Sequence, residues 1–149
     1  MSFSFRLQKI LDYKIKIEEE KKNKLGELVS LYNKLKIEID NVLLLKEEIT
    51  KKLETNFDIN YLNWASKSIQ GIYQTVKNNK EKMAELEKKI EKARNEYIEA
   101  RKERTLIERI KEKRYAEYQE ELKKKERKIL EDISIKMWVD KAIKEFELT

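Results

Sequence analysis

The chain contains no proline, cysteine or histidine, and only two glycines among its 149 residues. With Gly26 and Gly71 as its only glycines, it has few residues suited to tight turns. Without histidine and cysteine it cannot build a thiolate zinc site, a histidine-based catalytic triad or an imidazole base. The wide separation of the two glycines also excludes a glycine-rich phosphate loop. These absences predict a fold with few chain reversals, no cofactor, no metal site and no catalytic activity.

What the chain does contain is charge. Charged residues make up 43% of the sequence, against roughly a quarter in an ordinary domain. Apolar residues still make up 40%, which is too many for a simply disordered chain. The combination predicts long amphipathic helices. No apolar run approaches the roughly 18 residues needed to span a bilayer, and the start does not resemble a signal peptide, so we expect a soluble cytoplasmic protein.

Apolar residues recur in alternating steps of four and three from Leu7 to Leu53, the a and d pattern of a coiled coil. Ten of these 14 positions are apolar, and three polar ones fall together at Lys14, Glu18 and Lys21. The polar cluster predicts a weakly packed stretch. The same alternation returns from Ile69 to Tyr118, where 11 of 15 positions are apolar and most of the failures lie at the far end: Arg104, Lys111 and Arg114.

One segment, residues 55–60, interrupts the alternation. Asn56 is suited to the left-handed conformation at a helix end, and Asp58 is a good N-cap for the helix that follows. A turn centred near Phe57 pairs residues whose numbers add up to roughly 114, which places Phe3 opposite about Lys111.

The sequence therefore predicts an all-α fold, a long antiparallel two-helix coiled-coil hairpin in which helix 2 projects beyond helix 1. We expect a single elongated domain over residues 1–149, with helix 1 at about 3–54, a turn at about 55–60 and helix 2 at about 61–136. The order of the tail to residue 149 is left open. A parallel dimer of unfolded hairpins is the rival packing.

The net charge of +6 is concentrated in one segment, since residues 101–128 hold 12 basic and seven acidic side chains. The interleaved acids favour a solvated helix with i,i+4 pairs over nucleic-acid binding. A face for an acidic protein partner is a third reading. Acidic pairs such as Glu47 and Glu48 are interpreted as a solvated surface, because a two-helix rod encloses no pocket that would shift their pKa values.

The two helices are expected to pack along one seam, the row of a and d positions. Three groups of apolar residues are present in addition to those that this seam needs. Phe3 and Phe5 either pack on helix 2 near Ile107 and Ile110 or form a docking tip. A second group near the turn either caps the hairpin or forms an interface: Tyr61, Leu62, Trp64 and Tyr73. A third has no predicted partner and either binds a helix groove or folds back on the hairpin: Ile129, Ile133, Met137 and Trp138.

The residues from Phe3 to Lys14, followed by Glu18 and Glu19, resemble the opening of the flagellar export protein family FliJ. The length, the two long helices and the single reversal are similar too. The resemblance implies a component of the flagellar type III export apparatus, shaped like the central stalk of rotary ATP synthases. It also implies binding to the hexameric export ATPase, the membrane export gate and export chaperones, in the cytoplasm at the inner membrane of the flagellar base. An injectisome stalk protein of the same shape is a close alternative.

On this resemblance we assign two sets of contacts. The candidate ATPase contacts are Phe3, Phe5, Arg6, Leu7, Arg101, Arg104, Arg109, Lys111, Lys113 and Arg114. The candidate export-gate contacts are Trp64, Ile72, Tyr73 and Val76. The leading hypothesis is thus an interaction protein without enzymatic activity or a small-molecule substrate. A nucleic-acid-binding coiled coil and a self-associating scaffold rod are the other hypotheses.

Overall fold

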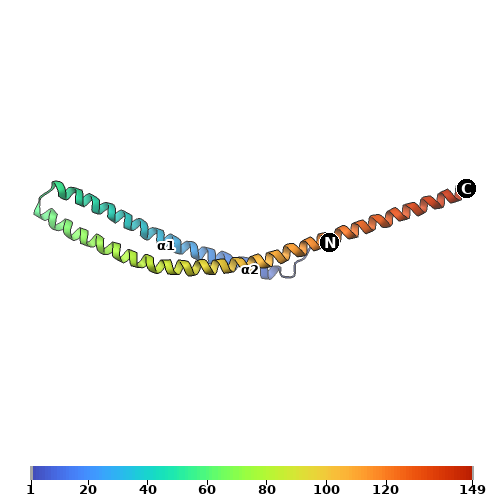
Figure 1. Cartoon of the computed structure of the whole chain (residues 1–149), viewed down its shortest axis with the longest axis horizontal. Helices are drawn as coiled ribbons and strands as arrows, with labels where there is room; N and C mark the ends of the chain where they lie inside the picture. Colours follow the sequence, from blue (N-terminus) through green and yellow to red (C-terminus); the bar gives the residue numbers. More distant parts are fainter. Residues whose placement is uncertain (1, 149) are drawn as a thin grey trace. The chain divides into compact units, whose positions relative to one another are not determined.

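A computed structural model describes residues 2–148 and contains, over that range, two α-helices and no strand. Helix α1 runs from Gln8 to Thr55 and α2 from Ile59 to Leu148, 48 and 90 residues long. The all-helical prediction is confirmed, and the second helix is the longer one (Figure 1). Since neither helix contains proline and each contains one glycine, nothing in the sequence interrupts them.

The chain divides into two compact units. The hairpin unit comprises Lys14–Lys102, and the terminal unit comprises Met1–Tyr13 together with Glu103–Thr149. In the hairpin unit α1 and α2 lie side by side and antiparallel on either side of the turn (Figure 1). The two helices thus pack against each other within one chain, as the hairpin prediction requires.

The connection between the helices is short, Asn56–Asp58. The backbone N–H of Asn60 donates to Asp58 Oδ1 at 3.2 Å, which confirms Asp58 as the N-cap of α2. Our expectation for Asn56 was wrong, because no described residue has a positive φ. Asn56 instead accepts a hydrogen bond from the Asp58 N–H on its side-chain oxygen, at 3.1 Å. An Asx turn thus replaces the left-handed cap and reverses the chain without glycine.

The predicted seam is confirmed position by position. All 14 predicted positions of α1 and its preceding turn are buried or half-buried, and so are 14 of the 15 in α2, Arg114 being the exposed one. The core of the hairpin unit lies near the turn, where Ile49, Ala65 and Ile72 pack together. The polar stretch that was predicted to pack weakly does so, since every residue from 12 to 38 is half-buried or exposed.

The pairing of the two helices differs from the predicted one by about one turn. Lys21 bonds Glu96, Tyr32 bonds Glu87 and Lys46 bonds Tyr73 across the hairpin unit, so paired residue numbers add up to 117 or 119. The prediction of roughly 114 assumed that the two helix ends are level. In the structure the first turn of α2 lies beyond the last turn of α1, and Phe57 and Ile59 are correspondingly exposed.

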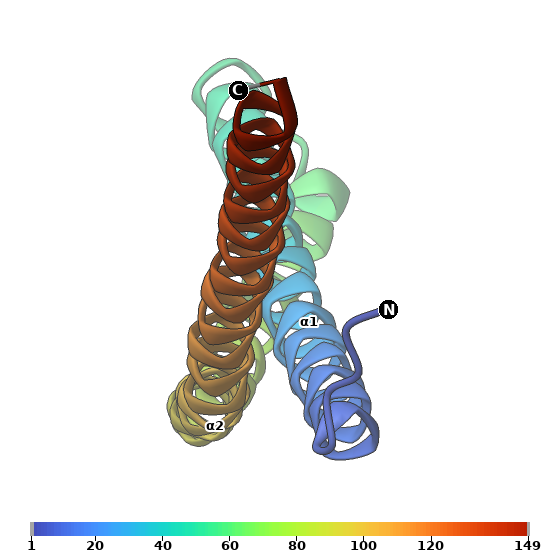
Figure 2. The same cartoon turned by 90° about the vertical axis from the view of Figure 1, so that its right-hand side faces the viewer.

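The N-terminal residues depart from the predicted helix. Residues 2–5 are irregular and α1 begins only at Gln8 (Figure 2), whose N–H donates to the Phe5 carbonyl at 3.1 Å. From residue 2 to residue 7 exposed side chains alternate strictly with buried or half-buried ones. This period of two suits an extended segment, whereas in a helix Phe3 and Phe5 would point to nearly opposite sides. The helical boundary near residue 3 was therefore wrong.

Candidate interaction surfaces

The two N-terminal phenylalanines are packed within the terminal unit. The Phe3 ring lies 5.2 Å from the Tyr115 ring and 5.4 Å from the Tyr118 ring, between centroids. Phe5 is 7% exposed. Of the two readings for these residues, packing is the one observed, and the Phe3 ring packs on Tyr115 and Tyr118 of α2. Phe3 therefore contacts residues further along α2 than predicted, as do the paired residues of α1 in the hairpin unit.

The other eight residues assigned to the ATPase differ in how far their side chains are exposed. Arg6, Arg101, Arg109, Lys113 and Arg114 are exposed, and Leu7, Arg104 and Lys111 are half-buried. Arg104 forms an ion pair with Glu108 one turn along α2. Arg101 belongs to the hairpin unit and the others to the terminal unit. Of the assigned cations on α2 in the terminal unit, the exposed ones are thus Arg109, Lys113 and Arg114.

Beyond Leu122 the helix α2 is exposed at every described residue. Helix continues to Leu148, so the predicted end at about 136 was wrong. The apolar row of this segment is open to solvent, with Trp138 71% exposed and Phe146 83% exposed. Exposed apolar groups in such number mark a surface that binds something else.

The four residues assigned to the export gate also differ in exposure: two are packed in or against the core, and two are open to solvent. Ile72 is buried in the core near the turn and Val76 packs against that core, as the seam predicts. Trp64 and Tyr73 are more than half exposed. The Lys46 ammonium donates to the Tyr73 hydroxyl at 2.7 Å and lies 4.4 Å from its ring centroid, which holds that ring in place.

Sequence reasoning missed part of the apolar surface at the turn. Phe57 and Ile59 are 83% and 70% exposed and extend the surface that Leu62 and Trp64 belong to. We call these four residues the turn tip. Phe57 and Ile59 lie in and just after the connection, outside the alternation of four and three. An apolar residue off the seam and beside a turn was the available signal.

Two polar pairs tie the hairpin unit together across the seam. The Lys21 ammonium donates to Glu96 at 3.2 Å, and this hydrogen bond, helped by the lysine charge, lowers the pKa of Glu96. The Tyr32 hydroxyl donates to Glu87 at 3.1 Å, and this hydrogen bond raises the pKa of Tyr32. The weak stretch of the seam is thus joined by polar contacts in place of apolar ones.

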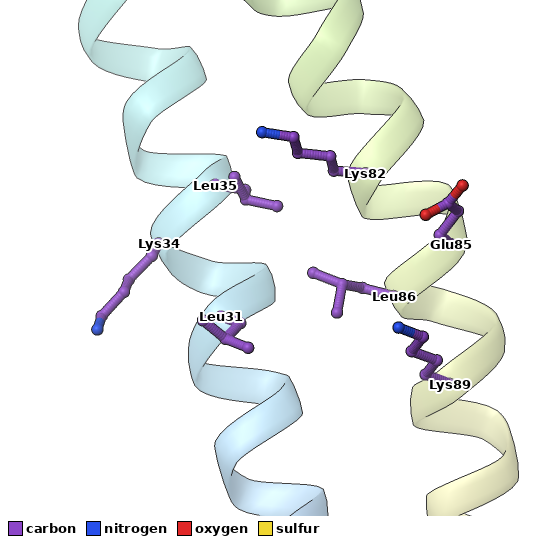
Figure 3. A pocket seen from close by; sticks show the side chains of 7 residues that line it. All are labelled: Leu31, Lys34, Leu35, Lys82, Glu85, Leu86 and Lys89. Carbon is purple, nitrogen blue, oxygen red and sulfur yellow. The ribbon is translucent and has the colours of Figure 1, made fainter.

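A groove runs along one side of the hairpin unit, with a volume of about 440 Å³. Figure 3 shows Leu31, Leu35 and Leu86 between the helices, with Lys82 directed across the gap and Lys89 running along α2 toward Leu86. A second hollow of about 370 Å³ shares Lys89 and continues past Leu28 and Ala93. We call the two together the leucine groove. Its lining residues are Lys24, Leu28, Leu31, Lys34, Leu35, Lys82, Glu85, Leu86, Lys89, Lys92, Ala93 and Glu96.

Among residues 2–148 no group of three potential metal ligands converges, and no described helix is long and apolar enough to cross a membrane. The chain matches the family model described as flagellar FliJ protein over residues 3–142. It belongs to the FliJ family. The match includes most of the exposed C-terminal part of α2, which had added nothing to the resemblance. No curated protein and no solved structure matches the chain. As a FliJ protein, it is related to flagellar export.

Proposed function

We propose that this chain is a non-enzymatic stalk of the flagellar export apparatus, which binds the export ATPase ring and couples it to the export gate and to export chaperones. In this proposal it acts in the cytoplasm, at the membrane face of the flagellar base. Membership of the FliJ family supports the system. The proposal that the chain acts as a stalk rests on the solvent exposure of α2 from Lys123 to Leu148.

That helix is hard to explain in an isolated molecule. Its apolar side chains gain nothing in water, and this part of α2 lacks the tertiary packing that supplies most of the stability of helices in proteins. A partner that surrounds it would bury the apolar row and complement its charges. A ring-shaped ATPase is such a partner, because a single helix can enter its central opening.

Phe3 and Phe5 are no longer proposed as direct contacts of the ATPase. Because Phe5 is buried and Phe3 already packs on two tyrosines, their rings support the terminal unit from within. The direct contacts then fall to the exposed cations Arg109, Lys113 and Arg114. Arg109 and Lys113 lie one turn apart and share a helix face.

The export-gate contact is proposed for the exposed aromatic side chains near the turn. Trp64 and Tyr73 are accessible, and aromatic residues contribute strongly to protein interfaces. Ile72 and Val76 act on this surface indirectly, by holding α2 against α1.

The test uses the purified chain and the purified export ATPase of the same organism. We expect Arg109→Glu, Lys113→Glu and Arg114→Glu together to weaken binding by about tenfold or more, since charge reversal turns attraction into repulsion. Stimulation of ATP hydrolysis should fall in parallel. The matched control reverses three exposed lysines of the hairpin unit, Lys36, Lys80 and Lys88, and should bind with little change. Equal affinity of both variants at low ionic strength would remove the proposed contact.

A further inference from the structure

The floor of the leucine groove is apolar and partly open to solvent. Leu31 is 49% exposed, and Leu28, Leu35 and Leu86 are half-buried. Leu28, Leu31 and Leu35 follow one another at steps of three and four on α1, so they form a row along the groove. Two packed helices cover each of these side chains on one side only. A third helix laid along the row would cover the other side.

The rim of the leucine groove is basic. It carries Lys24, Lys34, Lys82, Lys89 and Lys92, and none of the five forms an ion pair with any residue in the described range 2–148. Two acids also line it, so the lysines outnumber the acids by five to two. Glu96 is bonded to Lys21 and also lies within reach of the charges of Lys24 and Lys92, while Glu85 and Lys34 do not point into the gap in Figure 3. The groove therefore presents several cations beside an apolar floor.

The opposite side of the same seam is different. There Tyr32 donates to Glu87, and Arg94 lies 3.9 Å from Glu91. Its lining also includes Val29 and Ile90, but its charged groups have partners within the chain. The lining of that side thus carries one cation and two acids, whereas the leucine groove carries five lysines and two acids.

We propose that the leucine groove docks an amphipathic helix of a partner protein whose apolar face is flanked by aspartate and glutamate. The apolar row receives leucine-type side chains, and the five lysines meet the flanking acids. Along α1 the groove extends from Lys24 to Leu35, about 17 Å at 1.5 Å per residue, which fits about three turns of such a helix. A nucleic acid would use the lysines and leave the leucine floor in water.

This surface shares no residue with the contacts proposed for the export ATPase or the gate. The experiment therefore needs neither of those proteins. Its probe is a fluorescein-labelled helical peptide of about three heptads, with leucine at the a and d positions and glutamate at the e and g positions. Binding to the full chain is measured by fluorescence anisotropy at low and high salt. A second peptide carries lysine at the e and g positions.

We expect the glutamate peptide to bind the chain and the lysine peptide to bind at least about tenfold more weakly. Lys34→Glu, Lys82→Glu and Lys89→Glu together should weaken binding of the glutamate peptide by a similar factor. The control reverses Lys36, Lys80 and Lys88, which are exposed but do not line the groove, and should change affinity by less than about threefold. Circular dichroism confirms that both triple variants remain helical.

A substitution in the floor separates docking from charge attraction. Leu31→Ser removes an apolar side chain that is half exposed in the free chain, so the hairpin should fold while the peptide binds several times more weakly. Equal affinity for Leu31→Ser, or equal loss in the two triple-lysine variants, would overturn the proposal in favour of net charge alone. Sedimentation that shows a dimer abolished by the groove substitutions would overturn it in favour of a second copy as the occupant.

Discussion

At the scale of single residues, the buried polar side chain of Asn79 is the clearest conflict within the seam. It is 5% exposed, and no residue in the described part of the chain accepts a hydrogen bond from its Nδ2. It occupies a position where the alternation otherwise places apolar residues. A buried donor without a partner costs stability, although a polar residue at one seam position can help to set the pairing of the helices.

We expect Asn79→Leu to stabilise the chain by about 1–3 kcal/mol, because it removes a buried donor that has no acceptor. Urea unfolding followed by circular dichroism measures this change. The control is Asn95→Leu on the exposed face of α2, which should change the free energy of unfolding by less than about 0.5 kcal/mol. A loss of stability in Asn79→Leu would show that the amide has a partner or that leucine does not fit the seam.

The Lys21–Glu96 pair makes the stability of the hairpin unit depend on pH. The hydrogen bond from Lys21, together with its charge, lowers the pKa of Glu96 below its ordinary value of 4.5. A carboxylate with a lowered pKa stabilises the fold above the pKa of the unfolded chain, and the contribution is lost as pH falls through the folded value. The pair therefore contributes fully at neutral pH and not in strong acid.

We expect Glu96→Gln to be less stable than the unchanged chain at pH 7 and equally stable in acid below the lowered pKa of Glu96, where the carboxylate is protonated in both the folded and the unfolded state. Urea unfolding at the two pH values measures the difference. Glu99→Gln, at an exposed position on the same helix, is the control for removing one negative charge. A deficit of the same size at both pH values would mean that ionisation of Glu96 does not contribute.

At the scale of whole elements, the two helices are stabilised by packing along the seam, but each contains a glycine that lowers its stability. Gly71 lies inside α2 and Gly26 inside α1, and a methyl group added at either would meet no atom within 4 Å. Glycine in a helix interior loses more conformational entropy on folding than alanine does. Neither glycine is needed for a turn, because the chain reverses through Asn56 and Asp58.

We expect Gly71→Ala to stabilise the chain by about 0.5–1 kcal/mol, and Gly26→Ala by a similar amount. The slope of the urea transition should stay unchanged, because the surface exposed on unfolding is almost the same. Ala84→Gly, at an exposed site on α2, should shift stability by the same amount in the opposite direction. Destabilisation by Gly71→Ala would indicate that another molecule or segment approaches the glycine.

The start of α1 shows how a helical pattern can be extended too far. Leu7 and Leu11 fit the seam, and Phe3 continues it four residues earlier, so the helix was predicted to begin there. The sequence Ser2-Phe3-Ser4-Phe5 also alternates with a period of two, and that period is the one realised. Contact with Tyr115 and Tyr118 anchors an extended segment that has no helical hydrogen bonds of its own.

At the scale of the whole molecule, the chain comprises two units, and the proposed surfaces divide between them. The leucine groove and the exposed aromatic residues near the turn belong to the hairpin unit. Arg109, Lys113, Arg114 and the exposed part of α2 belong to the terminal unit. Charge reversal in one unit should therefore leave binding at the other unchanged, so the lysine control in the hairpin unit serves the ATPase experiment. It also serves the groove experiment, because its three lysines do not line the groove.

The sequence by itself determined the helical class, the single reversal, the N-cap at Asp58 and the membership of the seam, because each depends on residues close together in the chain. Only the tertiary structure decided the pairing between helices, the burial of Phe5 and the position of the leucine groove. These depend on how side chains from distant positions fill the space between two helices, and a change of one helical turn leaves the local pattern unaltered while it exchanges every partner across the seam.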